Sequence, residues 1–151
     1  GADGHLDVVR HIVESGVPVM GHLGLTPQSL HSLGGHKVQG REEGAGRKLL
    51  HQAKALEAAG CFGVVLECIP EDLAHQITDS LNLPTIGIGS GGGTSGQVMV
   101  LQDLLGLNNG FQPVFVRKYL EGADLIGGAL ETFARDVSEG SYPTLDESYL
   151  S

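Results

Sequence analysis

Hydrophobic positions recur along the chain in two patterns, one with helical spacing and one in short continuous runs. In four segments apolar residues return every three or four positions, which is the spacing of one helix face. Pro70 at the start of the third segment and glycines after the first two are typical of helix boundaries. The fourth segment is interrupted near Gly122 and at Gly127-Gly128. Helices are therefore predicted over 6–13, 45–56, 70–81 and, with interruptions, 113–139.

Short apolar runs lie between these helices, and each has the length of a strand. The predicted strands cover 17–21, 62–66, 84–88 and 97–101. Strands of about five residues that alternate with helices form parallel βαβ units. Because the composition shows no break, and no repeat beyond this unit, we predict a single α/β domain over residues 1–151.

The strand predicted over 62–66 ends in a lone carboxylate, Glu67. In α/β barrels and open parallel sheets, functional side chains lie where the strands end. Partial burial at such an end would hold a carboxylate ready for proton transfer. A structural ion pair, or a partner for the start of the helix that Pro70 opens, explains Glu67 equally well. From this segment alone both hypotheses remain open.

His22 follows the first predicted strand in the same way. Adjacent parallel strands of a barrel end at the same mouth, so His22 and Glu67 are expected to converge there. Such a pair is suited to acid/base chemistry or to orienting a substrate. A core histidine with satisfied hydrogen bonds is the alternative. His31 and His36 belong to a long polar loop over 23–41. The other histidines lie on predicted helices and are expected to be solvated: His5, His11, His51 and His75.

A glycine-rich segment follows the third predicted strand. Residues 87–92 (GIGSGG) fit the G-x-G-x-x-G pattern of dinucleotide-binding proteins. That interpretation also requires a helix to start at once, whereas here another strand-like run follows. The glycines instead favour close approach of backbone N–H groups to an anionic or flat ligand, or a flexible loop at the rim.

The composition narrows the classes of partner. A net charge of −9 argues against nucleic acid or an anionic membrane surface, so small-molecule ligands are expected. No apolar stretch approaches the roughly 18 residues of a membrane span. Cys61 and Cys68 have neither disulfide-framework nor zinc-site spacing. We therefore expect reduced, packed thiols in a cytoplasmic protein.

Six longer segments of the chain match the pattern of a known family: 17–29 (VPVMGHLGLTPQS), 33–35 (LGG), 38–41 (VQGR), 65–70 (VLECIP), 84–89 (PTIGIG) and 96–98 (GQV). They resemble the ketopantoate hydroxymethyltransferases, also called 3-methyl-2-oxobutanoate hydroxymethyltransferases. The similarity extends from about Leu6 to Tyr149. Three positions depart from the family: Ser90, where alanine is common, Val114 in place of a basic residue, and Gly127-Gly128 within a helix.

The resemblance implies the C-terminal half of a (β/α)8 barrel with parallel strands. It implies hydroxymethyl transfer from 5,10-methylenetetrahydrofolate, the co-substrate, to 3-methyl-2-oxobutanoate, giving 2-dehydropantoate for pantothenate and coenzyme A synthesis. Glu67 matches the family's general base, and His22 matches a residue that contacts the keto acid. The family depends on Mg²⁺ and forms large homo-oligomers, decamers among them.

The resemblance also implies that the family's magnesium ligands and its substrate-binding lysine precede the segment matched here. The last of these preceding elements in the family is a segment similar to Lys-x-Glu-Gly-Gly, of which Gly1-Ala2 would be the remnant. Asp3 is out of register with the family's metal ligand. We therefore expect a partial domain without metal ligands, with about four strands where a closed barrel has eight and about 250 residues. The chain alone is expected to be inactive.

Two alternatives stay open. One is another magnesium-dependent enzyme of the related phosphoenolpyruvate/pyruvate barrel group, against which the string GHLGLTPQ at 21–28 argues. The other is a truncated or split subunit that serves only as a structural partner in an assembly.

Overall fold

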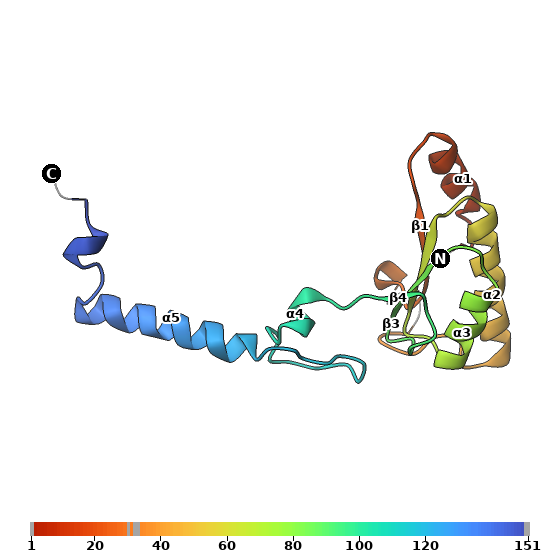
Figure 1. Cartoon of the computed structure of the whole chain (residues 1–151). Coiled ribbons are helices and arrows are strands. Elements are labelled where there is room, and N and C mark those ends of the chain that lie inside the picture. The colour runs from red at the N-terminus through yellow and green to blue at the C-terminus, as the bar shows by residue number, and fades with distance from the viewer. Residues whose placement is uncertain (1, 30, 32–33, 150–151) are drawn as a thin grey trace. The chain divides into compact units, whose positions relative to one another are not determined.

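The structure, a computed structural model, describes residues 2–29, 31 and 34–149 and divides into two compact units. Gly1–Val98 form the first unit and Met99–Ser151 the second (Figure 1). The first unit contains a parallel sheet, and the second is built from helices and irregular segments.

Four parallel strands form the sheet of the first unit, and their order in space is their order in the chain, β1-β2-β3-β4. This is the arrangement of consecutive strands in the wall of a (β/α)8 barrel, so the predicted α/β half-barrel is confirmed. The elements are α1 (Leu6–Glu14), β1 (Met20–Gly24), a 3-10 turn (Pro27–Ser29), α2 (Glu43–Ala58), β2 (Gly63–Glu67), α3 (Glu71–Asp79), β3 (Thr85–Ile88) and β4 (Gly96–Gln97).

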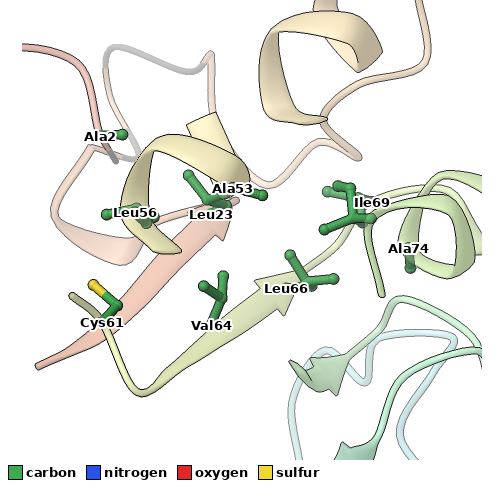
Figure 2. Packing of buried hydrophobic residues seen from close by; sticks show 10 residues of the cluster. Ala2, Leu23, Ala53, Leu56, Cys61, Val64, Leu66, Ile69 and Ala74 are labelled. Atoms are coloured by element: carbon green, nitrogen blue, oxygen red, sulfur yellow. The ribbon is translucent and has the colours of Figure 1, made fainter. Parts of the chain in front are cut away.

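Helices cover one face of this sheet. Side chains alternate between the two faces of a strand, and in β2 Val64 and Leu66 point toward the helices, where both are fully buried. Figure 2 shows these two side chains with Leu23 of β1, packed beneath Ala53 of α2. The remaining core residues come from α2, α3 and the connecting segments: Ala2, Leu56, Cys61, Ile69, Ala74 and Ile77.

Two strand boundaries differ from the prediction. Pairing of β1 with β2 begins at Met20, which lies opposite Gly63, so His22 lies inside β1 and not after its end. The predicted strand over 97–101 was wrong, because β4 ends at Gln97 and a short helix, α4 (Leu101–Leu104), follows. In the register of the sheet Gly96 and Gln97 lie opposite Ile86 and Gly87, the Val98 N–H donates to the Gly87 carbonyl at 3.0 Å, and α4 begins three residues later.

The second unit has a long C-terminal helix, α5 (Gly122–Glu139), and a 3-10 turn at Leu145–Glu147. The prediction of helix from 113 was wrong for residues before Gly122, and the predicted interruption at Gly127-Gly128 is absent, since α5 continues through both. A glycine costs about 1 kcal/mol relative to alanine inside a helix, which a helix of this length tolerates. Gly140, with φ of 72°, ends α5 in the left-handed conformation.

None of the helices in the described part of the chain combines the length and hydropathy that a membrane crossing requires.

Candidate active site

Within the first unit, His22 and Glu67 lie together on the sheet face opposite the one that packs against α2 and α3. In the register of the sheet Gly24 is opposite Glu67 and His22 is opposite Val65, so both side chains point to the same side. The imidazole Nε2 is 2.9 Å from the carboxylate Oε2. Side-chain exposure is 31% for His22 and 18% for Glu67, so the pair is partly desolvated but open to a ligand.

The surroundings of this pair are apolar. Val65, Ile86 and Ile88 lie on the same face of β2 and β3 and are half-buried. A hydrogen bond involving a charged group is stronger in such surroundings than in water. The predicted convergence of His22 and Glu67 is therefore observed, although His22 reaches Glu67 from within its strand.

The backbone around Glu67 is held in an unusual turn. Cys68, which follows Glu67, has a φ of 49°, a left-handed conformation that residues other than glycine seldom adopt. The Leu25 N–H donates to the Glu67 carbonyl oxygen at 2.8 Å. Gly24 permits this approach, because a Cβ at its position would overlap that same carbonyl oxygen. Gly24 and Ser90, discussed below, are residues that the sequence analysis did not assign to the site.

Both cysteines are free thiols, as predicted. Cys61 is buried in the core, and burial raises its pKa. Burial also raises the pKa of Cys68, and the neighbouring Glu67 charge raises it further. Both thiols therefore remain protonated near neutral pH.

The glycine-rich segment packs against α3. No helix follows β3 directly, so the dinucleotide-binding arrangement is absent here. The Gly92 N–H donates to Glu71 Oε1 at 3.2 Å. A Cβ on Gly91 would overlap the Glu71 side chain, and one on Gly93 would overlap His75. Close packing on the first turns of α3 thus accounts for Gly91 and Gly93.

A pocket of about 520 Å³ lies between the end of β1 and α2. It is lined by Leu23, Gly24 and Gln52 among others, and it includes neither His22 nor Glu67. At its rim Lys48 Nζ is 2.6 Å from Asp3 Oδ2. The Lys48 and Gln52 side chains hold the pKa of Asp3 below its ordinary value.

The other histidines lie apart from this pair. All four on predicted helices are exposed, as expected, and so are His31 and His36 in the loop. Within 2–29, 31 and 34–149, no three His, Cys, Asp or Glu side chains gather in a group that would hold a metal ion.

Comparison with known proteins decides the family. The family model described as ketopantoate hydroxymethyltransferase matches residues 1–145. The chain belongs to the ketopantoate hydroxymethyltransferase family. It is 54% identical over 149 residues to the 3-methyl-2-oxobutanoate hydroxymethyltransferase of Francisella tularensis subsp. tularensis (strain FSC 198), covering 99% of this chain and 56% of that relative.

A second relative of the same name, from Coxiella burnetii (strain CbuK_Q154), is 58% identical over 147 residues, covering 97% of this chain and 55% of the relative. The chain thus spans about half the length of the curated ketopantoate hydroxymethyltransferases that it matches. The resemblance found in the sequence is confirmed at the level of the family.

Proposed function

We propose that Glu67 and His22 carry out the proton transfer in the reaction of 5,10-methylenetetrahydrofolate with 3-methyl-2-oxobutanoate, which yields 2-dehydropantoate. Family membership supports the reaction. The observation that carries the assignment of residues is the 2.9 Å contact between His22 and Glu67 on the sheet face opposite the one that packs against α2 and α3.

Glu67 is the general base of this proposal. Its carboxylate takes the proton from C3 of the keto acid, and the C–H electron pair forms a C2–C3 double bond while negative charge moves to the keto oxygen. Over the reaction C3 of the enolate forms a bond to the methylene carbon of the folate, and the bonds from that carbon to N5 and N10 break. One water is consumed: its oxygen becomes the hydroxyl group, and its remaining proton and the proton taken from C3 end on the two nitrogens of the released tetrahydrofolate.

His22 orients that base. An ionised carboxylate only accepts hydrogen bonds, so the His22 Nε2–H donates to Glu67 Oε2. The bond fixes one carboxylate oxygen and leaves the other, Oε1, to receive the substrate proton. The proposal also places the His22 ring against the keto acid, because the ring remains partly exposed beside Glu67.

For the whole enzyme we propose a magnesium ion held by residues other than these 151. A divalent cation bound to the keto acid would stabilise the enolate charge. The described residues do not fit such a site, since they bring no three metal-binding side chains together. The part of the reaction proposed for this chain is accordingly proton transfer and orientation of the base.

The partners, cellular location and oligomeric state of the enzyme can also be proposed. We propose small-molecule substrates and no nucleic acid or membrane partner, supported by the net charge of −9. Free thiols at Cys61 and Cys68 support a cytoplasmic location. We also propose a homo-oligomer, a decamer by family resemblance, and light scattering on the purified protein tests this.

Deuterium exchange at C3 of 3-methyl-2-oxobutanoate in D2O, followed by proton NMR, tests the role of Glu67 without the folate. The assay is run on the chain alone and on the chain combined with the part of the Francisella relative that it does not span. Glu67→Gln is expected to lower the exchange rate by about 100- to 10,000-fold, the contribution of a general base. Glu14→Gln, an exposed change at the end of α1, is the control.

Two results would contradict the proposal. One is exchange that persists at the wild-type rate in Glu67→Gln. The other is the absence of exchange, and of 2-dehydropantoate formation with the folate and Mg²⁺ added, in both wild-type samples.

A further inference from the structure

We propose that Ser90 is a positioning residue for Glu67, acting by bracing the backbone on both sides of the turn that carries it. The inference rests on the proposed function of Glu67, and the structural part of its test stands independently. Ser90 follows β3 within the glycine-rich segment and is 1% exposed. Its hydroxyl does not take part in the proposed proton transfer.

The Ser90 hydroxyl contacts the chain before and after Glu67. Its Oγ donates to the Leu66 carbonyl oxygen at 2.8 Å. The same Oγ accepts the Ile69 N–H at 3.4 Å. The one hydroxyl proton belongs to the shorter contact, because the other carbonyl within reach, that of Ile88, lies 3.4 Å away. One side chain thus links the last peptide before Glu67 to the end of the turn after it.

Alanine is common at the position of Ser90 in the family, so in this chain the Ser90 bridge adds to the backbone contacts that already hold the turn. Cys68 keeps a left-handed φ of 49°, which a residue with a side chain retains only when its surroundings hold it. Two backbone hydrogen bonds hold Cys68 itself: its N–H donates to the Ile88 carbonyl at 2.9 Å, and its carbonyl accepts the Gln39 N–H at 2.8 Å. Ser90 adds a buried side-chain bridge that spans the whole turn.

The bridge matters for the position of the Glu67 carboxylate. The Glu67 side chain leaves the backbone between Leu66 and Cys68, so any rotation of this turn moves Oε2 relative to the imidazole of His22. Without the hydroxyl, the buried Leu66 carbonyl and Ile69 N–H both lose a partner, and the turn relaxes to recover other hydrogen bonds. We expect the His22–Glu67 contact to lengthen and the fraction of correctly aligned carboxylate to fall.

Ser90→Ala tests this inference, with Ser90→Thr as the variant that keeps the hydroxyl. Thr85→Val is the matched control, because it removes another fully buried hydroxyl, in β3, that makes no contact with the Glu67 turn. The first readout is the ¹⁵N signal of His22 Nε2, which reports its hydrogen bond to Glu67. The second is the rate of C3 deuteration, resolved into kcat and KM and measured in the two samples described above.

In Ser90→Ala the Nε2 signal is expected to shift toward its position in Glu67→Gln. The kcat of deuteration is expected to fall by about tenfold with KM unchanged, less than the ~100-fold cost of a 1 Å misplacement. Ser90→Thr should restore both where it folds. Thr85→Val should lower the melting temperature while leaving the Nε2 signal and kcat at wild-type values.

The outcomes separate the two proposals. A wild-type Nε2 signal in Ser90→Ala, or an equal shift in Thr85→Val, would overturn the positioning role. If wild-type protein shows no deuteration but the Nε2 signal still responds to Ser90→Ala and to Glu67→Gln, the proposed function fails and the bracing of Glu67 by Ser90 stands.

Discussion

The two faces of the sheet are formed by alternating residues of the same strands: one face packs into the hydrophobic core, and the other carries the candidate active site. On the face toward the helices, Val64 and Leu66 are fully buried among apolar side chains. On the opposite face, Val65 is half-buried and Glu67 meets His22. Successive residues of a strand point to opposite sides, so one short segment supplies both the core of the protein and its candidate base.

This difference between the two faces separates the residues that stabilise the fold from the residues proposed to transfer the proton. Burial against α2 and α3 fixes the strands by apolar contacts. The face toward the candidate site keeps its polar pair partly exposed, at some cost in burial, because a substrate has to reach it. Changes on the first face should therefore affect the free energy of unfolding, and changes on the second face should affect proton transfer.

Gly24→Ala is expected to have the largest effect on stability. Its φ of 91° already disfavours a side chain, and the added Cβ would overlap the Glu67 carbonyl oxygen. We expect a loss of about 2–4 kcal/mol in unfolding free energy from backbone strain and overpacking. Urea unfolding measures it, with Gly44→Ala, where a Cβ meets nothing within 4 Å, as the control. Equal stabilities for the two variants would contradict the close approach of β1 to Glu67.

Val64→Ala and Val65→Ala compare the two faces directly. The residues are adjacent and identical in type, but only Val64 is fully buried. Val64→Ala should cost about 2–3 kcal/mol and Val65→Ala about 1 kcal/mol or less, since the cost follows the apolar area and cavity left behind. Chemical denaturation of both variants checks the order. A larger loss for Val65→Ala would reverse the assignment of the faces.

Thr85→Val probes a polar group on the helix-covered face. The Thr85 hydroxyl is fully buried, bonds Thr78 Oγ1 at 2.8 Å and accepts the Ser95 N–H at 3.2 Å. Valine has nearly the same shape but leaves the Ser95 N–H without this acceptor. A loss of about 1–2 kcal/mol is expected, measured by thermal unfolding. No loss at all would show that these contacts contribute nothing net.

The smallest of the predicted effects concerns the reactivity of the Cys68 thiol, which depends on the charge of Glu67. Burial and then the Glu67 charge raise the pKa of Cys68. Glu67→Gln removes the second cause, so the pKa should fall part of the way toward its ordinary value, and more thiolate forms at a given pH. Alkylation by iodoacetamide at pH 8 should therefore become faster, because the thiolate is the form that reacts. Cys61, whose raised pKa has burial as its cause, serves as the internal control.

Much of the fold follows from local pattern, and the exceptions have physical reasons. The end of β2 at Glu67 was predicted because an apolar run stops at a charge. The start of β1 was not, since it depends on which residues of β2 lie opposite: pairing begins at Met20, beyond Pro18. Val98 to Val100 have the composition of a strand, yet the register of β4 with β3 ends at Gln97, and the Val98 N–H makes the last hydrogen bond given between the two segments.

The sequence predicted the two functional side chains of the candidate site, but not the residues that hold them in place. Glu67 and His22 carry functional groups at strand positions, which a sequence displays. Ser90 reaches Leu66 and Ile69 across more than twenty positions of chain, and Gly24 is needed because of a carbonyl oxygen on the next strand. Such requirements arise only from contacts between distant segments, so no local pattern reveals them.

The strand order has a consequence for how the first unit is made on the ribosome. Among the described strands, β2 and β3 each pair with the strand synthesised just before and with the one synthesised just after, and β1 and β4 pair with one neighbour. A nascent chain can therefore enlarge its sheet one strand at a time at the growing edge, without waiting for a distant segment to be translated. Glu67 arrives only with β2 and Ser90 only after β3, so the site near His22 is completed once the segment after β3 has been synthesised.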